Sequence, residues 1–446
     1  MADRVAAISA PGKVLMAGGY LILDSQYSGV VLSTEARFYS HVERHSSCDD
    51  IKVHSPQFRS EWIYDCNLQQ TNAAQSNDFV HLALEEVNKY LQYKLSTSIK
   101  GLRISIGADN DFYSQRGYLE KRNLEATYEN LKKVPKINKD LENINKTGLG
   151  SSAALITSLV GSLLLSYDAI TRELTSSDLQ LVHNLAQYIH CKAQGKVGSG
   201  FDVSAAVYGS QIYSRFSPAV IKDLIDQPTS GESIDAVVNK KWDSSVHKIR
   251  LPHGVVMHLA DIEHGSHTPS LVKKVNEWRS NNSEQAQEIY SSLDYSNKKL
   301  AELLAALDVS YNSDKDNYLH ALDHLSNKIP SEWSTDSNNA VVKQFVELKS
   351  TLSSIRASFR NLSVNAGVPI EPEEQTRLLD ACSSIQGVIG GGVPGAGGYD
   401  AIYLLAIQST VTATEIERQW LAWEELSVSP LVCSEGFAGI ECYEFK

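Results

Sequence analysis

Three glycine-rich stretches carry the residues of this chain whose types and spacing suit the binding or transfer of an anionic group. They are "SAPGKVLMAGGYLILD" from residue 9, "NKTGLGSSAALITSLVGSLLL" from residue 145 and "IGGGVPGAGGYDAIYLL" from residue 389. Glycine adopts backbone conformations that are closed to other residues and lets a ligand approach the main chain. The three stretches therefore direct the search for a site to backbone groups as much as to side chains.

The second stretch joins a small polar loop to a long apolar run. Gly148 and Gly150 precede a predicted helix over Ala153 to Leu165, and Ser151 and Ser152 can cap its start. The free N–H groups and the positive dipole end of such a helix attract anions. It is not a Walker loop, because no Lys-Ser or Lys-Thr follows the second glycine. The stretch alone fits a phosphate site and an ordinary capped helix equally well.

Lys13 and Asp202 are the charged candidates for chemistry. Pro11 and Gly12 interrupt a strand, so Lys13 projects from a fixed turn, although a lone lysine after a turn is also an ordinary surface residue. Asp202 lies in "AQGKVGSGFDVSAAVYG", where it could cap a helix. It could equally be a carboxylate beside a phosphate, positioning a nucleophile or a metal. The spacing leaves both interpretations open.

The third stretch formally contains GxGxxG at Gly390, Gly392 and Gly395. A dinucleotide site also needs a helix that opens there and an acidic residue further along a βαβ unit, and the sequence has neither. We reject that interpretation. The concentration of six glycines instead favours a ligand that is contacted by the backbone.

The elements that must position these residues are strands and helices in alternation. Runs up to Arg44, "YLILD" among them, predict an antiparallel opening sheet, and an Asn-Asp cap predicts a helix from Asn77. Apolar residues from Val341 to Leu362 alternate spacings of three and four, which predicts a core helix. Further segments follow the same rules: a strand "GLRISIGAD", a helix over 178–194, a polar linker over 223–246, and final strands before a helix over 412–423. The chain is expected to be α+β, with domains at 1–225 and 226–446.

Composition excludes several classes of partner. The 446 residues carry a net charge of -12 with no basic block, which argues against nucleic acid or an anionic membrane. Neither a signal peptide nor an apolar stretch of membrane-spanning length is found. Six scattered cysteines read as reduced thiols. We expect a cytoplasmic protein with small-molecule substrates and no evident obligate protein partner.

Taken in order, the motifs resemble those of the GHMP kinase superfamily, and they are close to the phosphomevalonate kinases of fungal and plant type. The resemblance rests on "SAPGKVLMAGGYLILD", "KTGLGSSAA", "HCKAQGKVGSGFDVSAAVYGSQ" and "VPGAGGYDAI", and weaker likeness extends it over nearly the whole chain. "GLGSSA" identifies only the superfamily, whereas "AQGKVGSGFDV" and "PGAGGYDAI" are much more specific.

The resemblance implies an N-terminal domain like domain two of ribosomal protein S5, a ferredoxin-like C-terminal domain, and an active site between them. It implies that Lys13 and Asp202 are catalytic and that Ser152 ligates Mg²⁺. The ATP phosphates would be held by the loop Lys146, Thr147, Gly148, Leu149, Gly150, Ser151, Ser152 and Ala153.

The same resemblance implies transfer of a phosphoryl group from ATP to 5-phosphomevalonate, giving diphosphomevalonate and ADP in the mevalonate route to isoprenoids and sterols. The acceptor would contact Lys13, Tyr20, Gly198, Ser199, Gly200, Asp202, Ser266, Thr268, Gly397 and Gly398. Alternatives on the same fold are mevalonate kinase, diphosphomevalonate decarboxylase and a catalytically silent binding protein.

One departure concerns the metal. Related mevalonate kinases carry a glutamate ligand in the helix before the aspartate motif, and here that position is Cys191, with His190 beside it. We therefore expect water and phosphate oxygens to complete an octahedral Mg²⁺ shell.

Overall fold

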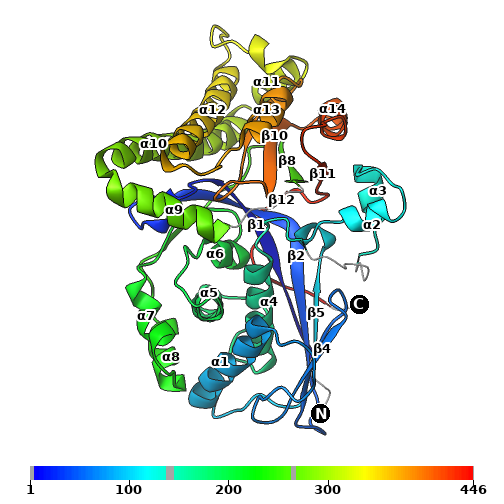
Figure 1. The fold of residues 1–446 in the computed structure, drawn as a ribbon, viewed down its shortest axis with the longest axis vertical. Coiled ribbons are helices and arrows are strands. Elements are labelled where there is room, and N and C mark those ends of the chain that lie inside the picture. The colour runs from blue at the N-terminus through cyan, green and yellow to red at the C-terminus, as the bar shows by residue number, and fades with distance from the viewer. Residues whose placement is uncertain (1–4, 137–144, 263–267, 445–446) are drawn as a thin grey trace.

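The computed structural model describes residues 5–136, 145–262 and 268–444 (Figure 1). Within these ranges, nine strands form the first sheet, in the order β13-β1-β2-β5-β3-β4, with β6 and β12 pairing β2 and with β7 pairing β6. Their bounds are β1 (Val5–Ala17), β2 (Gly29–Arg44), β3 (Ile51–Ser55), β4 (Ser60–Tyr64), β5 (Leu102–Ala108), β6 (Gln211–Ser214), β7 (Ser245–Lys248), β12 (Glu435–Gly436) and β13 (Glu441–Cys442). The long opening pair β1 and β2 is antiparallel, as the sequence predicts.

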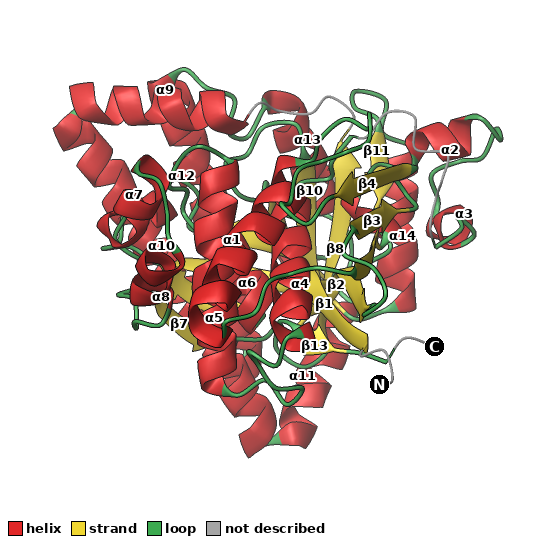
Figure 2. Ribbon diagram, turned by 90° about the horizontal axis from the view of Figure 1, so that it is seen from below, coloured by secondary structure: helices red, strands yellow, loops and turns green. Residues whose placement is uncertain are grey.

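Four helices cover the first sheet, and Figure 2 shows them in front of its strands. They are α1 (Asp78–Leu95), α4 (Ser151–Ser166), α5 (Ser176–Ala193) and α6 (Phe201–Tyr208). Helix α4 packs directly on β1 and β2, and all of its residues except Ser152 are buried. A helix that is apolar all round belongs inside a protein, so α4 is the central helix of this half.

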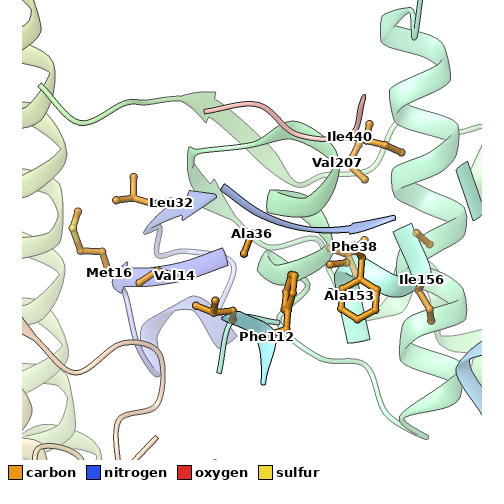
Figure 3. Close-up of a cluster of buried hydrophobic side chains, with 14 of the residues drawn as sticks. Val14, Met16, Leu32, Ala36, Phe38, Phe112, Ala153, Ile156, Val207 and Ile440 are labelled. Carbon is orange, nitrogen blue, oxygen red and sulfur yellow. The ribbon is translucent and has the colours of Figure 1, made fainter. Parts of the chain in front are cut away.

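The two faces of β1 explain how one strand serves both the core and the exposed loop. Val14 and Met16 point into the large core that α4 completes (Figure 3), whereas Leu15 packs with Val31 and Ala205 on the opposite face. Because side chains alternate along a strand, Lys13 lies on the same face as Leu15, toward α6. Strand alternation thus places the lysine outside the apolar core.

The second sheet holds four antiparallel strands within the described ranges, in the order β11-β8-β10-β9. They are β8 (Val255–Ile262), β9 (Val388–Gly392), β10 (Ala401–Ile407) and β11 (Val428–Pro430). One face packs on α13 and α14, and the other packs on the long helices α10 to α12. The helices of this half are α9 (Thr268–Asn281), α10 (Ser283–Ser313), α11 (Lys315–Ser326), α12 (Ala340–Ala366), α13 (Glu373–Cys382) and α14 (Thr410–Leu421).

Two sequence predictions about elements are wrong. "YLILD" is not a strand but a short 3-10 helix, η1 (Leu21–Leu23), because Tyr20 has a positive φ of 64° that breaks the extended chain. The segment 223–246 is not an irregular linker: most of it lies in α7 (Ala219–Asp226), α8 (Gly231–Val238) and the start of β7. The Ser230 side chain starts α8 with a reciprocal capping box, a local signal that the polar composition concealed.

The remaining short elements are η2 (Asn110–Phe112), α2 (Arg116–Glu120), α3 (Tyr128–Lys132) and η3 (Pro330–Glu332). The predicted domains 1–225 and 226–446 stay a prediction. Several elements after residue 225 lie with the first sheet, because α8 packs on α1, β7 pairs β6, and β12 and β13 return to β2 and β1. The α+β class is confirmed. Among the described residues, no helix combines the length and the apolar character needed to cross a membrane.

Candidate active site

Helices α4 and α6 both begin at a left-handed glycine and have no side-chain cap. Gly150 precedes α4 and Gly200 precedes α6, each with φ of 79°. Other helices, such as α1 and α5, are capped by Asn77 and Thr175. The expected serine cap of α4 is therefore wrong. Val203 N donates to Asp202 Oδ1 at 3.0 Å, and no other first-turn N–H group of α4 or α6 has a side-chain acceptor among the described residues, which is the arrangement that binds anions.

Lys13 lies between these two helix starts. Its Nζ donates to Gly148 O at 2.7 Å and lies 5.4 Å from the centre of the Phe201 ring. Gly150 has φ of 79°, which favours glycine, and a Cβ there would sit 3.1 Å from the Lys13 Cε, closer than an ordinary contact. Burial lowers the pKa of the Lys13 ammonium, and the carboxylates of Asp202 and Asp400 oppose that shift.

Ser152, His190 and Asp202 form a chain of polar groups at the start of α4. His190 Nε2 lies 3.1 Å from Ser152 Oγ and 3.9 Å from Asp202 Oδ2. Burial lowers the pKa of His190, and the opposing effect of Asp202 does not cancel it, so we take the imidazole as neutral. A neutral Nε2 can accept the Ser152 hydroxyl proton, which turns the lone pairs of Oγ toward other ligands.

The first and third glycine-rich stretches contact each other directly. Gly395 N donates to Leu15 O at 2.9 Å, and the Tyr20 hydroxyl donates to Ala396 O at 2.6 Å. Tyr20 is buried, and that burial raises its pKa. These bonds join the two sheets beside Lys13, because Leu15 and Tyr20 flank the same end of β1.

Asp400 and the glycines before it complete this side of the site. A Cβ on Gly148 would lie 3.9 Å from the Asp400 Cβ, so the carboxylate stands beside the α4 loop. Gly398 N donates to Ile370 O at 2.8 Å. The third stretch therefore reaches the α4 loop through Asp400, with Gly397 and Gly398 forming the turn that leads to it.

The loop before α6 has its carbonyl groups held from inside the protein. Arg215 donates to Gly198 O at 2.6 Å, the Tyr213 hydroxyl donates to Ser199 O at 3.1 Å, and Gln187 donates to Gly200 O at 2.5 Å. The predicted acceptor residues on this loop are thus firmly placed beside Asp202. Two further predicted acceptor residues lie elsewhere in the chain. Thr268 is the first residue of α9, and Ser266 lies outside the described residues.

A cavity of about 540 Å³ opens on the other side of the α4 loop. Its walls combine aromatic rings with polar groups, which is the character of a site for a planar heterocycle. It is lined by Phe58, Ser60, Trp62, Gln75, Ser76, Asn77, Asp78, Phe79, Tyr113, Lys146, Ser151, Ser152, Leu155 and Ala193. Lys146, Ser151 and Ser152 belong to the predicted ATP loop, so the cavity continues that loop.

The donors at the start of α4 fit Mg²⁺. The Ser152 hydroxyl and the Asp202 carboxylate are hard oxygen donors, which Mg²⁺ prefers over nitrogen or sulfur. No group of three or more His, Cys, Asp or Glu side chains suited to a metal is found among the described residues. That a bound ion draws most of its shell from phosphate and water stays a prediction.

Sequence reasoning missed several of these residues. It left His190 without a role and gave none to Asp400, although Asp400 lies in the third glycine-rich stretch, two residues after Gly398. Nothing in the local sequence marks Gln187, Tyr213 or Arg215 as partners of residues 198–200. Three of the aromatic residues that line the cavity, Phe58, Trp62 and Phe79, come from the segment between β3 and the start of α1, where no motif was recognised.

The fold and this site define a kinase of the GHMP class. The model of the GHMP kinase N-terminal domain matches residues 118–210. In fold the chain is similar to Lin0012 of Listeria innocua, with a TM-score of 0.71 and 16% identity over 99% of this chain and 100% of that one. It is also similar to Streptococcus pneumoniae phosphomevalonate kinase in complex with phosphomevalonate and AMPPNP, with a TM-score of 0.64 and 15% identity over 96% and 99% of the two chains.

Two curated relatives are much nearer in sequence. A phosphomevalonate kinase of Aspergillus fumigatus is 36% identical over 94% of this chain and 91% of its own length. A phosphomevalonate kinase of Arabidopsis thaliana, named as peroxisomal, is 36% identical over 98% and 95%. The chain belongs to the phosphomevalonate kinase family, as its motifs predict.

Proposed function

We propose that this protein transfers the γ-phosphoryl group of ATP to 5-phosphomevalonate, giving 5-diphosphomevalonate and ADP in the mevalonate pathway. The observation that carries the proposal is the position of Lys13 between the uncapped starts of α4 and α6. One helix start faces the predicted ATP loop and the other bears the predicted acceptor loop. A cation between two anion sites is what transfer between two phosphates requires.

The nucleophile in this reaction is a phosphate oxygen. A phosphate monoester has a second pKa near ~6, so the acceptor is largely dianionic at neutral pH and scarcely needs a general base. The harder task is to bring that dianion up to the γ-phosphate of ATP. Catalysis is then mostly positioning and charge neutralisation.

Each residue of the site has a part in that task. The Lys13 ammonium neutralises charge on both phosphates, most strongly in the transition state. The N–H groups at the start of α4 hold the ATP phosphates, and the aromatic cavity beside them suits the adenine ring. Asp202 orients Lys13 and the acceptor. It is not needed as a general base, because the acceptor phosphate has already lost its proton at neutral pH. Mg²⁺, when bound, would further neutralise the phosphates, with Ser152 as its ligand from the protein.

His190 orients the proposed metal ligand. With Nε2 as the acceptor, its contact with Ser152 would fix the hydroxyl hydrogen and leave an Oγ lone pair for the ion, and the Gln194 amide nitrogen lies 3.1 Å from the same Nε2. His190 thus contacts Ser152 from the part of α5 in which related mevalonate kinases carry the glutamate ligand.

The test is ATP turnover by the purified protein with mevalonate, phosphomevalonate and diphosphomevalonate in parallel, with and without Mg²⁺. We expect ADP and diphosphomevalonate only with phosphomevalonate and Mg²⁺. The Lys13→Met variant serves as the background control. Turnover of mevalonate but not phosphomevalonate would overturn the proposal and favour a mevalonate kinase. Release of CO₂ from diphosphomevalonate would favour the decarboxylase, and no turnover of any substrate would favour a binding protein.

A further inference from the structure

Arg215 is a buried cation beside the loop that the proposed function assigns to the acceptor. It is 7% exposed and follows β6. Its guanidinium donates to Leu23 O at 2.5 Å and to Gly198 O at 2.6 Å, and its buried Nε has no hydrogen-bond partner. No carboxylate in the described ranges forms an ion pair with Arg215. Asp24, whose charge opposes the lowering of the Arg215 pKa by burial, is itself paired with Arg279 at 3.0 Å.

A buried charge without a counter-ion is costly, so its presence calls for an explanation. The other arginine with the same 7% exposure, Arg356, contacts the carboxylates of Glu371 and Asp380 at 2.7 and 2.8 Å. If Arg215 only filled space in the core, a neutral side chain could do the same. The buried Arg215 charge without an ion-pair partner is explained if an anionic ligand binds near it.

The loop geometry shows where that negative charge would lie. In a planar trans peptide, the C=O of one residue points opposite to the N–H of the next. The carbonyls of residues 198–200 accept from Arg215, Tyr213 and Gln187, so each of the amides of residues 199–201 points away from the side chain that binds the preceding carbonyl. No acceptor among the described residues is hydrogen-bonded to those three amides. These amides lie at the start of the eight-residue helix α6, next to Lys13.

We propose that Arg215 is a specificity-determining residue, whose buried guanidinium both orients the 198–200 loop and supplies the positive charge that selects a phosphorylated acceptor over its unphosphorylated counterpart. The inference rests on the proposed function. Arg215 acts through the peptide groups of the loop: its charge polarises them, and their amides meet the phosphate.

Three variants test the proposal. Arg215→Met removes the charge and keeps the apolar stem, Arg215→Lys keeps a charge but loses the planar fork, and Tyr213→Phe removes one uncharged bond from the same loop. For each, we would measure KM and kcat with phosphomevalonate, KM for ATP, the Ki of mevalonate as a competitive inhibitor, and the melting temperature.

The expected result is a change in selectivity rather than a general loss. Arg215→Met should raise the KM for phosphomevalonate by about tenfold or more, and raise the Ki of mevalonate and the KM for ATP far less. Arg215→Lys should fall between wild type and Arg215→Met. Tyr213→Phe should weaken both acceptor ligands to a similar, smaller extent.

Two outcomes would overturn the inference while leaving the proposed function intact. One is an Arg215→Met enzyme with the KM of wild type. The other is an equal loss of phosphomevalonate and mevalonate binding in all three variants, in proportion to a fall in melting temperature, which would mark Arg215 as purely structural. If Arg215→Met does not fold, the same comparison between Arg215→Lys and Tyr213→Phe decides. If wild type does not turn over phosphomevalonate, the proposed function itself fails.

Discussion

Arg215 and Arg356 are equally buried, yet the protein treats their charges in opposite ways. Arg356, on α12, is enclosed by Glu371, which is 4% exposed and is also contacted by Arg360 at 2.9 Å. Arg215, beside the acceptor loop, donates only to backbone carbonyls. The cluster around Arg356 is electrically complete, whereas the one around Arg215 is open.

The lysines divide in the same way. Lys192, on α5, lies 2.8 Å from the fully buried carboxylate of Glu86, which also contacts Lys89 and the Tyr188 hydroxyl. Lys13 instead donates to the carbonyl of Gly148, and no carboxylate in the described residues forms an ion pair with it. Buried cations that stabilise the fold are thus paired with carboxylates of the protein, whereas the cations beside the site have no such ion pair and can interact with an anionic ligand. Variants of Arg356, Lys13 and Lys192 test that division, as do those given above for Arg215, and a variant of Asp202 tests the role of its carboxylate.

The largest effect is expected from opening a closed cluster. Arg356→Met leaves the buried Glu371 with the Thr376 hydroxyl and with only the half-exposed Arg360 as a charged partner, so the free energy of unfolding should fall by about 3 kcal/mol. Denaturant unfolding measures this change, and kcat of the folded fraction should stay within about twofold of wild type. The double variant Arg356→Met, Glu371→Leu should recover part of the loss. A variant of wild-type stability with low kcat would place this cluster in the site.

The next largest effect is on chemistry alone. Lys13→Met should lower the rate of the chemical step by ~10²-fold or more, the scale seen when one preorganised electrostatic donor is lost, with little change in stability. Single-turnover kinetics and a melting curve measure the two quantities. Lys192→Met is the matched control and should show the reverse pattern. Similar losses of rate in both variants would contradict the distinction between open and closed cations.

The smallest effect concerns the form of a pH profile. Asp202→Asn should reduce the rate but keep its rise with pH near ~6, because that rise reports ionisation of the acceptor phosphate and not of Asp202. Rate–pH profiles at saturating ATP, with wild type as control, measure it. A variant that loses the low-pH limb and recovers only in alkaline buffer would identify Asp202 as a general base.

Local signals were sufficient for elements that local physics decides. The Asn77 cap and the apolar stripe from Val341 to Leu362 correctly predicted α1 and α12, because capping and helical periodicity are properties of a short window. The "GLGSSA" loop likewise announced the start of α4. Its capping was misjudged because Ser152 bonds His190, which belongs to another helix.

The site residues that sequence reasoning missed are set by tertiary structure. Spacing directed attention to Cys191 at the position of a metal ligand, but neighbours on a helix point about 100° apart. His190 accordingly faces Ser152, while Cys191 packs with Phe216 and Trp242. Arg215 meets Gly198 only because β6 runs beside the loop before α6. No local pattern reports such a contact.

The pairing of β13 with β1 bears on how the chain is made. Ile8 lies opposite Cys442, and Ile440 packs in the same core as Val14 and Phe38 (Figure 3). During synthesis, β1 leaves the ribosome long before β13 exists, so one edge of the first sheet stays open until most of the chain has been translated. The second sheet, whose strands lie between residues 255 and 430, can form before the first is closed. During translation, the second sheet can therefore be completed before the first sheet, which begins at the N-terminal strand.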